Sequence, residues 1–77
     1  MSYQKHFKVE YSGTEKDGRY VTGSETVIKY NAQEAADQVR TWYTDGTFGI
    51  LDNLRIERIW IFHDDFRNDW EITDFWD

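Results

Sequence analysis

The chain has 77 residues, no cysteine, no proline and a formal net charge of −6. This length predicts a single compact domain over residues 1–77, and the lack of cysteine excludes disulfides and thiolate metal sites. No apolar run is long enough to span a membrane and no signal-like apolar core follows the N-terminus, so we expect a cytoplasmic protein without membrane contact.

The first 30 residues predict a β-hairpin. Residues 3–11 alternate between apolar and polar side chains, which is typical of a half-buried strand. Residues 12–18 are rich in glycine and hydroxyl side chains and predict a turn, and residues 19–30 predict the return strand. Gly23 lies inside the return strand, where it predicts a β-bulge.

A helix is predicted over residues 31–43. Asn31 suits the N-cap, because its side-chain oxygen can accept from a free backbone N–H, and Glu34 is placed to reach back to the Asn31 backbone N–H. The apolar residues that follow recur at helical spacing and form one stripe: Ala32, Ala35, Ala36, Val39, Trp42 and Tyr43.

Two further strands are predicted, at residues 54–63 and 70–76, with a turn at residues 67–69. Strict alternation in the third strand places Ile56, Trp60 and Phe62 on one face and Ile59 and Ile61 on the other. The order ββαββ predicts an α+β, two-layer fold, in which the helix covers one face of a four-stranded antiparallel sheet. The opposite face then meets water and is a candidate for self-association or partner binding, because the chain has aromatic residues enough for both faces.

Charge is distributed unevenly along the chain. Residues 1–30 carry five Lys/Arg and four Asp/Glu, a net of +1, whereas residues 31–77 carry four and eleven, a net of −7. The acidic half disfavours direct binding to nucleic acid and favours a basic partner, although such charge also serves ordinary solubility. The basic residues of the first hairpin leave a nucleic-acid contact from that end open: Lys5, Lys8, Lys16, Arg19 and Lys29.

Residues 62–77 interleave aromatic and acidic side chains. Carboxylates along strands can approximate the spacing of phosphates, and Trp and Phe supply apolar contacts typical of protein interfaces. The alternative is an ordinary amphipathic strand with its aromatic side chains in the core. The run predicts a partner-binding surface of Asp64, Asp65, Phe66, Asp69, Trp70, Glu71, Asp74 and Trp76.

Catalytic and cofactor-binding patterns are weak in this sequence. His63 with Asp64 and Asp65 is the best candidate for a metal site, but only His6 and scattered acids remain to complete it. The serines lie outside any nucleophile motif, and the glycines lack the strand-to-helix spacing of a phosphate-binding loop. We therefore expect no enzyme, no metal and no cofactor.

In its whole-chain character the sequence resembles the small phage-encoded inhibitors of bacterial defence, including the anti-CRISPR proteins. The resemblance is carried by a short acidic chain, a hairpin that enters a capped helix through residues 30–36, and a second hairpin through Ile59 and Trp70. It implies stoichiometric blockade of a nucleic-acid-guided or nucleic-acid-binding complex, without catalysis, and assigns no site residues. The leading prediction is therefore a binding protein that blocks a basic, nucleic-acid-binding surface of a larger protein or ribonucleoprotein complex. The alternative is a homodimeric structural or regulatory module that associates through its open sheet face.

Overall fold

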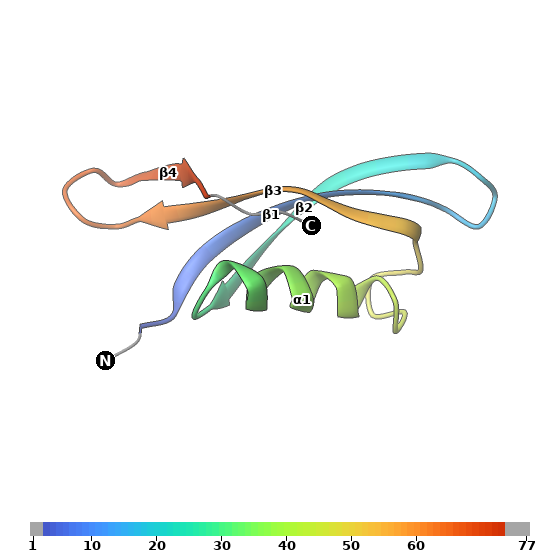
Figure 1. Ribbon diagram of the computed structural model, residues 1–77, viewed down its shortest axis with the longest axis horizontal. Helices are drawn as coiled ribbons and strands as arrows, with labels where there is room; N and C mark the ends of the chain where they lie inside the picture. The colour runs from blue at the N-terminus through green and yellow to red at the C-terminus, as the bar shows by residue number, and fades with distance from the viewer. Residues whose placement is uncertain (1–2, 74–77) are drawn as a thin grey trace.

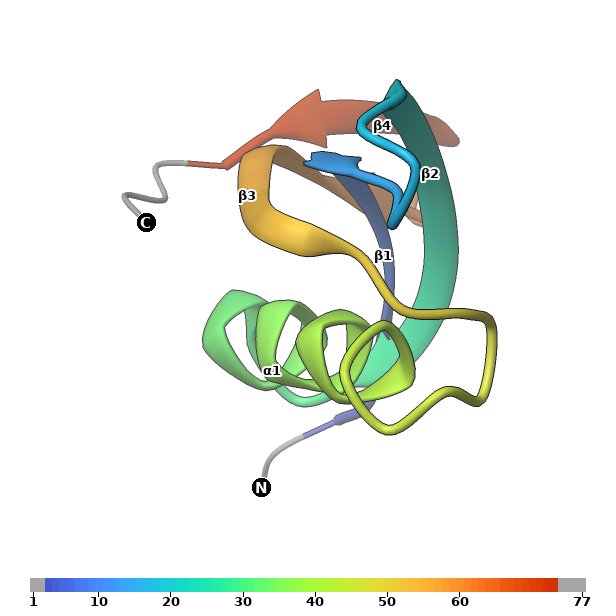
Figure 2. The same ribbon diagram turned by 90° about the vertical axis from the view of Figure 1, so that its right-hand side faces the viewer.

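The structure, a computed structural model, describes residues 3–73. Its elements are β1 (Lys5–Thr14), β2 (Tyr20–Lys29), α1 (Ala32–Trp42), β3 (Asp52–His63) and β4 (Asp69–Ile72). The strands form one antiparallel sheet in the order β2-β1-β3-β4, and α1 lies along one face of it (Figures 1 and 2). The predicted α+β fold of order ββαββ is confirmed. Within residues 3–73, no helix combines the length and apolar content needed to cross a membrane.

The helix begins at the predicted cap. The Asn31 side-chain oxygen accepts from the Glu34 backbone N–H at 2.8 Å, which satisfies one of the free donors of the first turn. The Glu34 carboxylate accepts from the Asn31 side-chain Nδ2 at 3.3 Å, and not from the backbone N–H that the sequence analysis predicted. At the other end Tyr43 caps the helix, and its N–H donates to the carbonyl of Val39.

The hydrophobic core lies between α1 and the three strands that it contacts, which are β1, β2 and β3. The helix contributes small side chains, which let its backbone approach the sheet closely, and the strands contribute the larger ones. The buried residues of this core are Phe7, Val9, Tyr11, Val27, Ala35, Ala36, Val39, Tyr43, Ile56 and Ile59.

A β-bulge in β3 changes which residues of that strand face the helix. Glu10 pairs with Arg58, but the next residue, Tyr11, pairs with Ile56, so Glu57 is an extra residue in β3. Ile56 and Ile59 are therefore both buried against α1. The predicted placement of Ile56 and Ile59 on opposite faces is wrong, because strict alternation allows for no bulge.

Gly23 does not mark a bulge, contrary to the sequence analysis. The pairing of β1 with β2 runs without a break from Lys5 opposite Lys29 to Thr14 opposite Tyr20. A Cβ at Gly23 would lie 2.6 Å from the hydroxyl oxygen of Tyr11. The glycine therefore makes room for the ring of its cross-strand neighbour.

The last described strand pairs with β3 alone. Thr73, just after β4, donates from its backbone N–H and from its hydroxyl to the Ile59 carbonyl, at 2.8 and 3.1 Å. Among the described elements, β4 contacts β3 and does not reach α1. The predicted strand 70–76 is thus seen at Asp69–Ile72, and Asp74 and Trp76 lie outside the described residues.

Candidate partner-binding surface

The predicted site falls on the hairpin formed by β3 and β4. Its strands pair from Trp60 opposite Ile72 to His63 opposite Asp69, and residues 64–68 connect them. We call these five residues the hairpin tip. The hairpin extends past the N-terminal end of α1, so its tip stands clear of the two-layer body (Figure 1).

Asp65 and Asn68 shape the hairpin tip. The Asp65 carbonyl accepts from the Asn68 N–H at 3.2 Å, and Asn68 adopts a φ of 50°, a conformation that asparagine tolerates better than most residues. The Asp65 carboxylate accepts from the Arg67 N–H at 2.9 Å. This backbone hydrogen bond, with a weaker contribution from the Arg67 guanidinium, lowers the pKa of the Asp65 carboxyl below its ordinary value. Asp65 is therefore a structural residue of the turn.

Arg67 partly neutralises the acidic hairpin. Its guanidinium lies 3.5 Å from Asp65 and 3.2 Å from Glu71, and both pairs are solvent-exposed. Within residues 3–73, no ion pair involves Asp64 or Asp69, and both side chains are exposed. These two carboxylates are the ones most available to a cationic partner.

Phe66 is the most exposed large apolar side chain of the described residues, with 96% of its surface accessible. It lies in the hairpin tip between Asp65 and Arg67. An exposed phenylalanine on a narrow turn, close to free carboxylates, combines an apolar anchor with a charged surround.

The two faces of the hairpin separate the remaining aromatic and acidic residues. Trp70 is paired with Phe62, their ring centroids are 5.1 Å apart, and both lie on the sheet face opposite α1, which we call the open face. Asp69 and Glu71 alternate with Trp70 and so lie on the other face, where Glu71 is 3.5 Å from His63. The structure thus places Asp64, Asp65 and Phe66 in the hairpin tip, Asp69 directly after it at the start of β4, and Trp70 on the open face.

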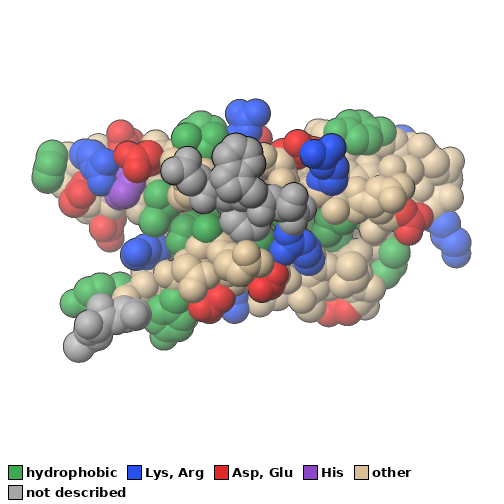
Figure 3. Space-filling view, viewed as in Figure 1, with side chains coloured by type: hydrophobic (Ala, Val, Ile, Leu, Met, Phe, Trp, Pro, Cys, Tyr) green, Lys and Arg blue, Asp and Glu red, His purple; other side chains and the backbone are tan. Residues whose placement is uncertain are grey.

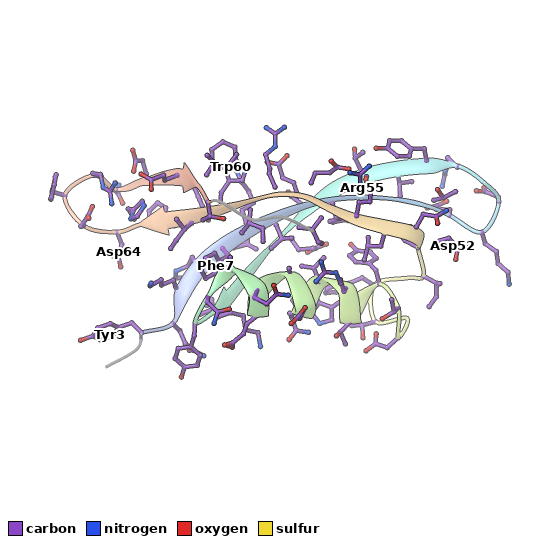
Figure 4. The ribbon with its side chains drawn as sticks, in the orientation of Figure 1. Tyr3, Phe7, Asp52, Arg55, Trp60 and Asp64 are labelled. Atoms are coloured by element: carbon purple, nitrogen blue, oxygen red, sulfur yellow. The ribbon has the colours of Figure 1, made fainter. Side chains whose placement is uncertain are left out.

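The open face carries an aromatic cluster that the sequence analysis did not assemble. The Lys8 ammonium lies 5.4 Å from the ring centroid of Trp60 and 5.2 Å from that of Trp70, a double cation–π contact. The indole N–H of Trp60 donates to the Glu10 carboxylate. Figure 4 shows Trp60 projecting from the sheet on the side away from α1. The cluster depends on the pairing of Lys8 with Trp60, and no local sequence signal specifies that register.

A cleft of about 510 Å³ separates the hairpin from the start of β1. It is visible as a hollow between the hairpin and the N-terminal segment in Figure 3. The cleft includes both histidines, His6 and His63, with Asp64 and Asp65. The described part of the chain nevertheless contains no group of three or more His, Cys, Asp or Glu side chains placed to hold a metal ion. The His63 Nε2 lies 3.5 Å from a carboxylate oxygen of Glu71.

The basic residues of the first hairpin do not form one cluster. Lys5 and Lys29 pair at one end of the β1–β2 ladder, whereas Lys16 and Arg19 lie around the turn at the other end, where Arg19 pairs with Glu15 at 2.5 Å. Lys8 lies between the two tryptophans of the open face. This separation weakens the expectation of a nucleic-acid contact by the first hairpin, which requires a continuous positive surface.

Comparisons of the chain with models of protein families, with curated proteins and with solved structures found no match.

Proposed function

We propose that this protein is a non-enzymatic binding protein that inserts its β3–β4 hairpin tip into a basic, nucleic-acid-binding surface of a larger protein or ribonucleoprotein complex and blocks it. Such an activity is that of the phage-encoded inhibitors of bacterial defence that the sequence resembles. The observation that carries the proposal is the exposed Phe66 of the hairpin tip, which lies in the chain between the exposed carboxylates of Asp64 and Asp69.

The two kinds of side chain act at different steps of binding. The carboxylates attract a positively charged surface and so raise the association rate, which falls as salt screens them. Phe66 contributes after contact, because burying its exposed ring removes apolar surface from water and slows dissociation.

The conformation of the hairpin tip is also preorganised in the free protein. The hydrogen bonds of Asp65 and the ion pairs of Arg67 with Asp65 and Glu71 limit the conformations of the turn. A tip that already has its bound shape loses less conformational entropy on association.

The test is a pull-down from bacterial lysate at low and high salt, with bound proteins identified by mass spectrometry. Three forms are compared: wild type, the hairpin variant Asp64→Asn/Asp69→Asn, and the control Asp17→Asn/Asp52→Asn. The control removes the same charge at the far end of the sheet, as the positions of Asp52 and Asp64 in Figure 4 show. We expect wild type and control to retain a nucleic-acid-binding protein at low salt and the hairpin variant to lose it.

A separate variant, Phe66→Ala, tests the apolar contact. With the captured partner purified, we expect faster dissociation and little change in the association rate. Equal capture by the hairpin variant and the control, or no capture of a nucleic-acid-binding protein by wild type, would contradict the proposed function.

The homodimeric module remains the second candidate, favoured by apolar side chains exposed on the open face. Ile28 and Ile72 are each 51% exposed there, and Trp70 is 36% exposed. A two-fold contact centred on this aromatic cluster would, however, bring the Lys8 ammonium of each copy near that of the other. Sedimentation of a Trp70→Lys variant tests this candidate, because an open-face dimer would dissociate when a further charge enters its interface.

A further inference from the structure

The outer strand β2 is a long, regular edge of the sheet. It pairs with β1 on one side only and forms the end of the strand order, at the side of the sheet in Figure 2. Its ten residues keep one register with β1 from end to end. Such an edge offers a row of backbone donors and acceptors to another strand.

The turn between β1 and β2 identifies the outward-facing groups. The Glu15 N–H donates to the Arg19 carbonyl at 2.8 Å, so these two residues form a hydrogen-bonded pair. Hydrogen-bonded and non-hydrogen-bonded pairs alternate along an antiparallel ladder. The residues of β2 whose N–H and C=O groups point away from β1 are therefore Tyr20, Thr22, Ser24, Thr26 and Ile28.

These outward-facing residues lack the features that usually protect an edge strand. All five are uncharged and exposed, and no bulge interrupts the pairing of β2 with β1. The chain contains no proline to block an approaching strand. Glu25 is one of the β2 residues whose backbone groups point toward β1. Its carboxylate accepts from the Tyr43 hydroxyl at 2.8 Å, on the face of the sheet that α1 covers.

The five outward-facing residues of β2 can pair with the same five residues of a second copy of the chain, with Ser24 at the centre of the pairing. An antiparallel pairing centred there sets Ser24 opposite Ser24, Thr22 opposite Thr26 and Tyr20 opposite Ile28, all on the open face. Tyr20 and Ile28 are 66% and 51% exposed in the single chain. In this pairing Tyr20 of each copy lies against Ile28 of the other, so both side chains gain an apolar neighbour. A pairing centred on Glu25 would instead oppose two carboxylates.

From this symmetry we infer that a second copy of the chain pairs antiparallel with β2, centred on Ser24, and joins the two sheets into one continuous sheet. The helix lies on one face of the sheet and not beside the outer edge of β2, so it does not occupy the position of an added strand (Figure 2). The hairpin tip is at the opposite edge of the sheet. The inference is therefore independent of the proposed function.

Cross-linking of Ser24→Cys tests the register. Because the chain has no native cysteine, each single variant can form only one disulfide between two copies. Directly opposed Cα atoms of a hydrogen-bonded pair lie about 5.5 Å apart, within disulfide range. We expect rapid dimer formation by Ser24→Cys under mild oxidation, and much slower formation by the controls Thr22→Cys and Thr26→Cys, which do not oppose themselves.

The variant Ser24→Pro tests the backbone pairing without breaking the ladder to β1, because it removes an N–H that faces outward. We expect wild type and Ser24→Ala to sediment at twice the 9.3 kDa monomer mass at high concentration, and Ser24→Pro to sediment as a folded monomer with an unchanged circular dichroism spectrum. A monomeric wild type up to millimolar concentration, or a dimer with equal cross-linking at all three positions, would overturn the inference. A dimer lost in Trp70→Lys but kept in Ser24→Pro would also overturn it and would indicate the open-face contact.

Discussion

The hydroxyl oxygens of Tyr11 and Tyr43 lie 2.6 Å apart in the core, although 32 residues separate them in the chain. Their ring centroids are 4.7 Å apart. The Tyr43 hydroxyl hydrogen is donated to the Glu25 carboxylate at 2.8 Å, so Tyr11 is the donor to Tyr43. This chain of hydrogen bonds ties the C-terminal end of α1 to β1 and β2.

Replacing Tyr43 by Phe removes both bonds and leaves two polar groups, the Tyr11 hydroxyl and the Glu25 carboxylate, short of a partner. We expect the free energy of unfolding to fall by about 1–3 kcal/mol, measured by urea denaturation. The control is Tyr30→Phe, because Tyr30 is 48% exposed and its hydroxyl can bond to water. Equal stability of the two variants would show that the buried bonds contribute nothing net.

The same tyrosine makes stability depend on alkaline pH. Burial, and then the hydrogen bonds with Tyr11 and Glu25, raise the pKa of the Tyr43 hydroxyl above its ordinary value. Above pH ~10 the unfolded chain releases this proton and the folded chain keeps it, so the stabilisation present below that pH is lost as pH rises. We expect the free energy of unfolding to fall more steeply above pH ~10 in wild type than in Tyr43→Phe. Parallel profiles would contradict this assignment.

Gly23→Ala tests the close approach of Tyr11. The added Cβ would lie 2.6 Å from the Tyr11 Oη and 2.9 Å from its Cζ, and the ring cannot move without breaking its bond to Tyr43. We expect a loss of about 1–3 kcal/mol in the free energy of unfolding. In a double-mutant cycle with Tyr11→Phe, we expect the losses in free energy of unfolding of the two single variants to add to more than the loss of the double variant. Full additivity would show that the alanine destabilises the protein through a contact other than the Tyr11 hydroxyl.

The acid titration of Asp65 distinguishes two causes of its lowered pKa. The larger contribution is the hydrogen bond from the Arg67 backbone N–H, which the variant Arg67→Ala retains. We therefore expect the Asp65 pKa, followed by NMR, to stay below its ordinary value in this variant. Because the folded-state pKa is lowered, the stabilisation is present at neutral pH and is lost as pH falls through the folded-state value. A return to the ordinary value would assign the shift to the guanidinium.

The sequence predicted the fold because its local signals agree. The cap at Asn31 and the alanine-rich stripe of the helix each specify structure within a few residues. The turn chemistry of residues 12–18 predicted the first hairpin but placed its turn too early, because Ser12 and Thr14 pair with both β2 and β3 and so belong to β1. The faces of β3 could not be predicted beyond the bulge, because the extra Glu57 shifts the alternation by one residue and is specified only by pairing with β1.

The layout of the candidate site follows from local structure that the sequence shows only in part. Asp64, Asp65 and Phe66 are consecutive and stay together in the loop, which begins earlier than the turn predicted at residues 67–69. Period-two alternation separated Trp70 from Asp69 and Glu71, although the sequence shows them as one run. The contact of Lys8 with Trp60 and Trp70 joins three strands, and therefore requires the full sheet order.

The position of the hairpin tip, beyond the end of the helix and away from the core, has an evolutionary consequence (Figure 1). Residues that pack on the core are constrained by many neighbours at once, whereas those of the hairpin tip have few neighbours to satisfy. We therefore expect substitutions at exposed positions such as Asp64, Phe66 and Asp69 to leave the fold intact. Under the proposed function, a lineage could retarget this hairpin to a changing partner surface while the helix and the three strands that it contacts stay the same.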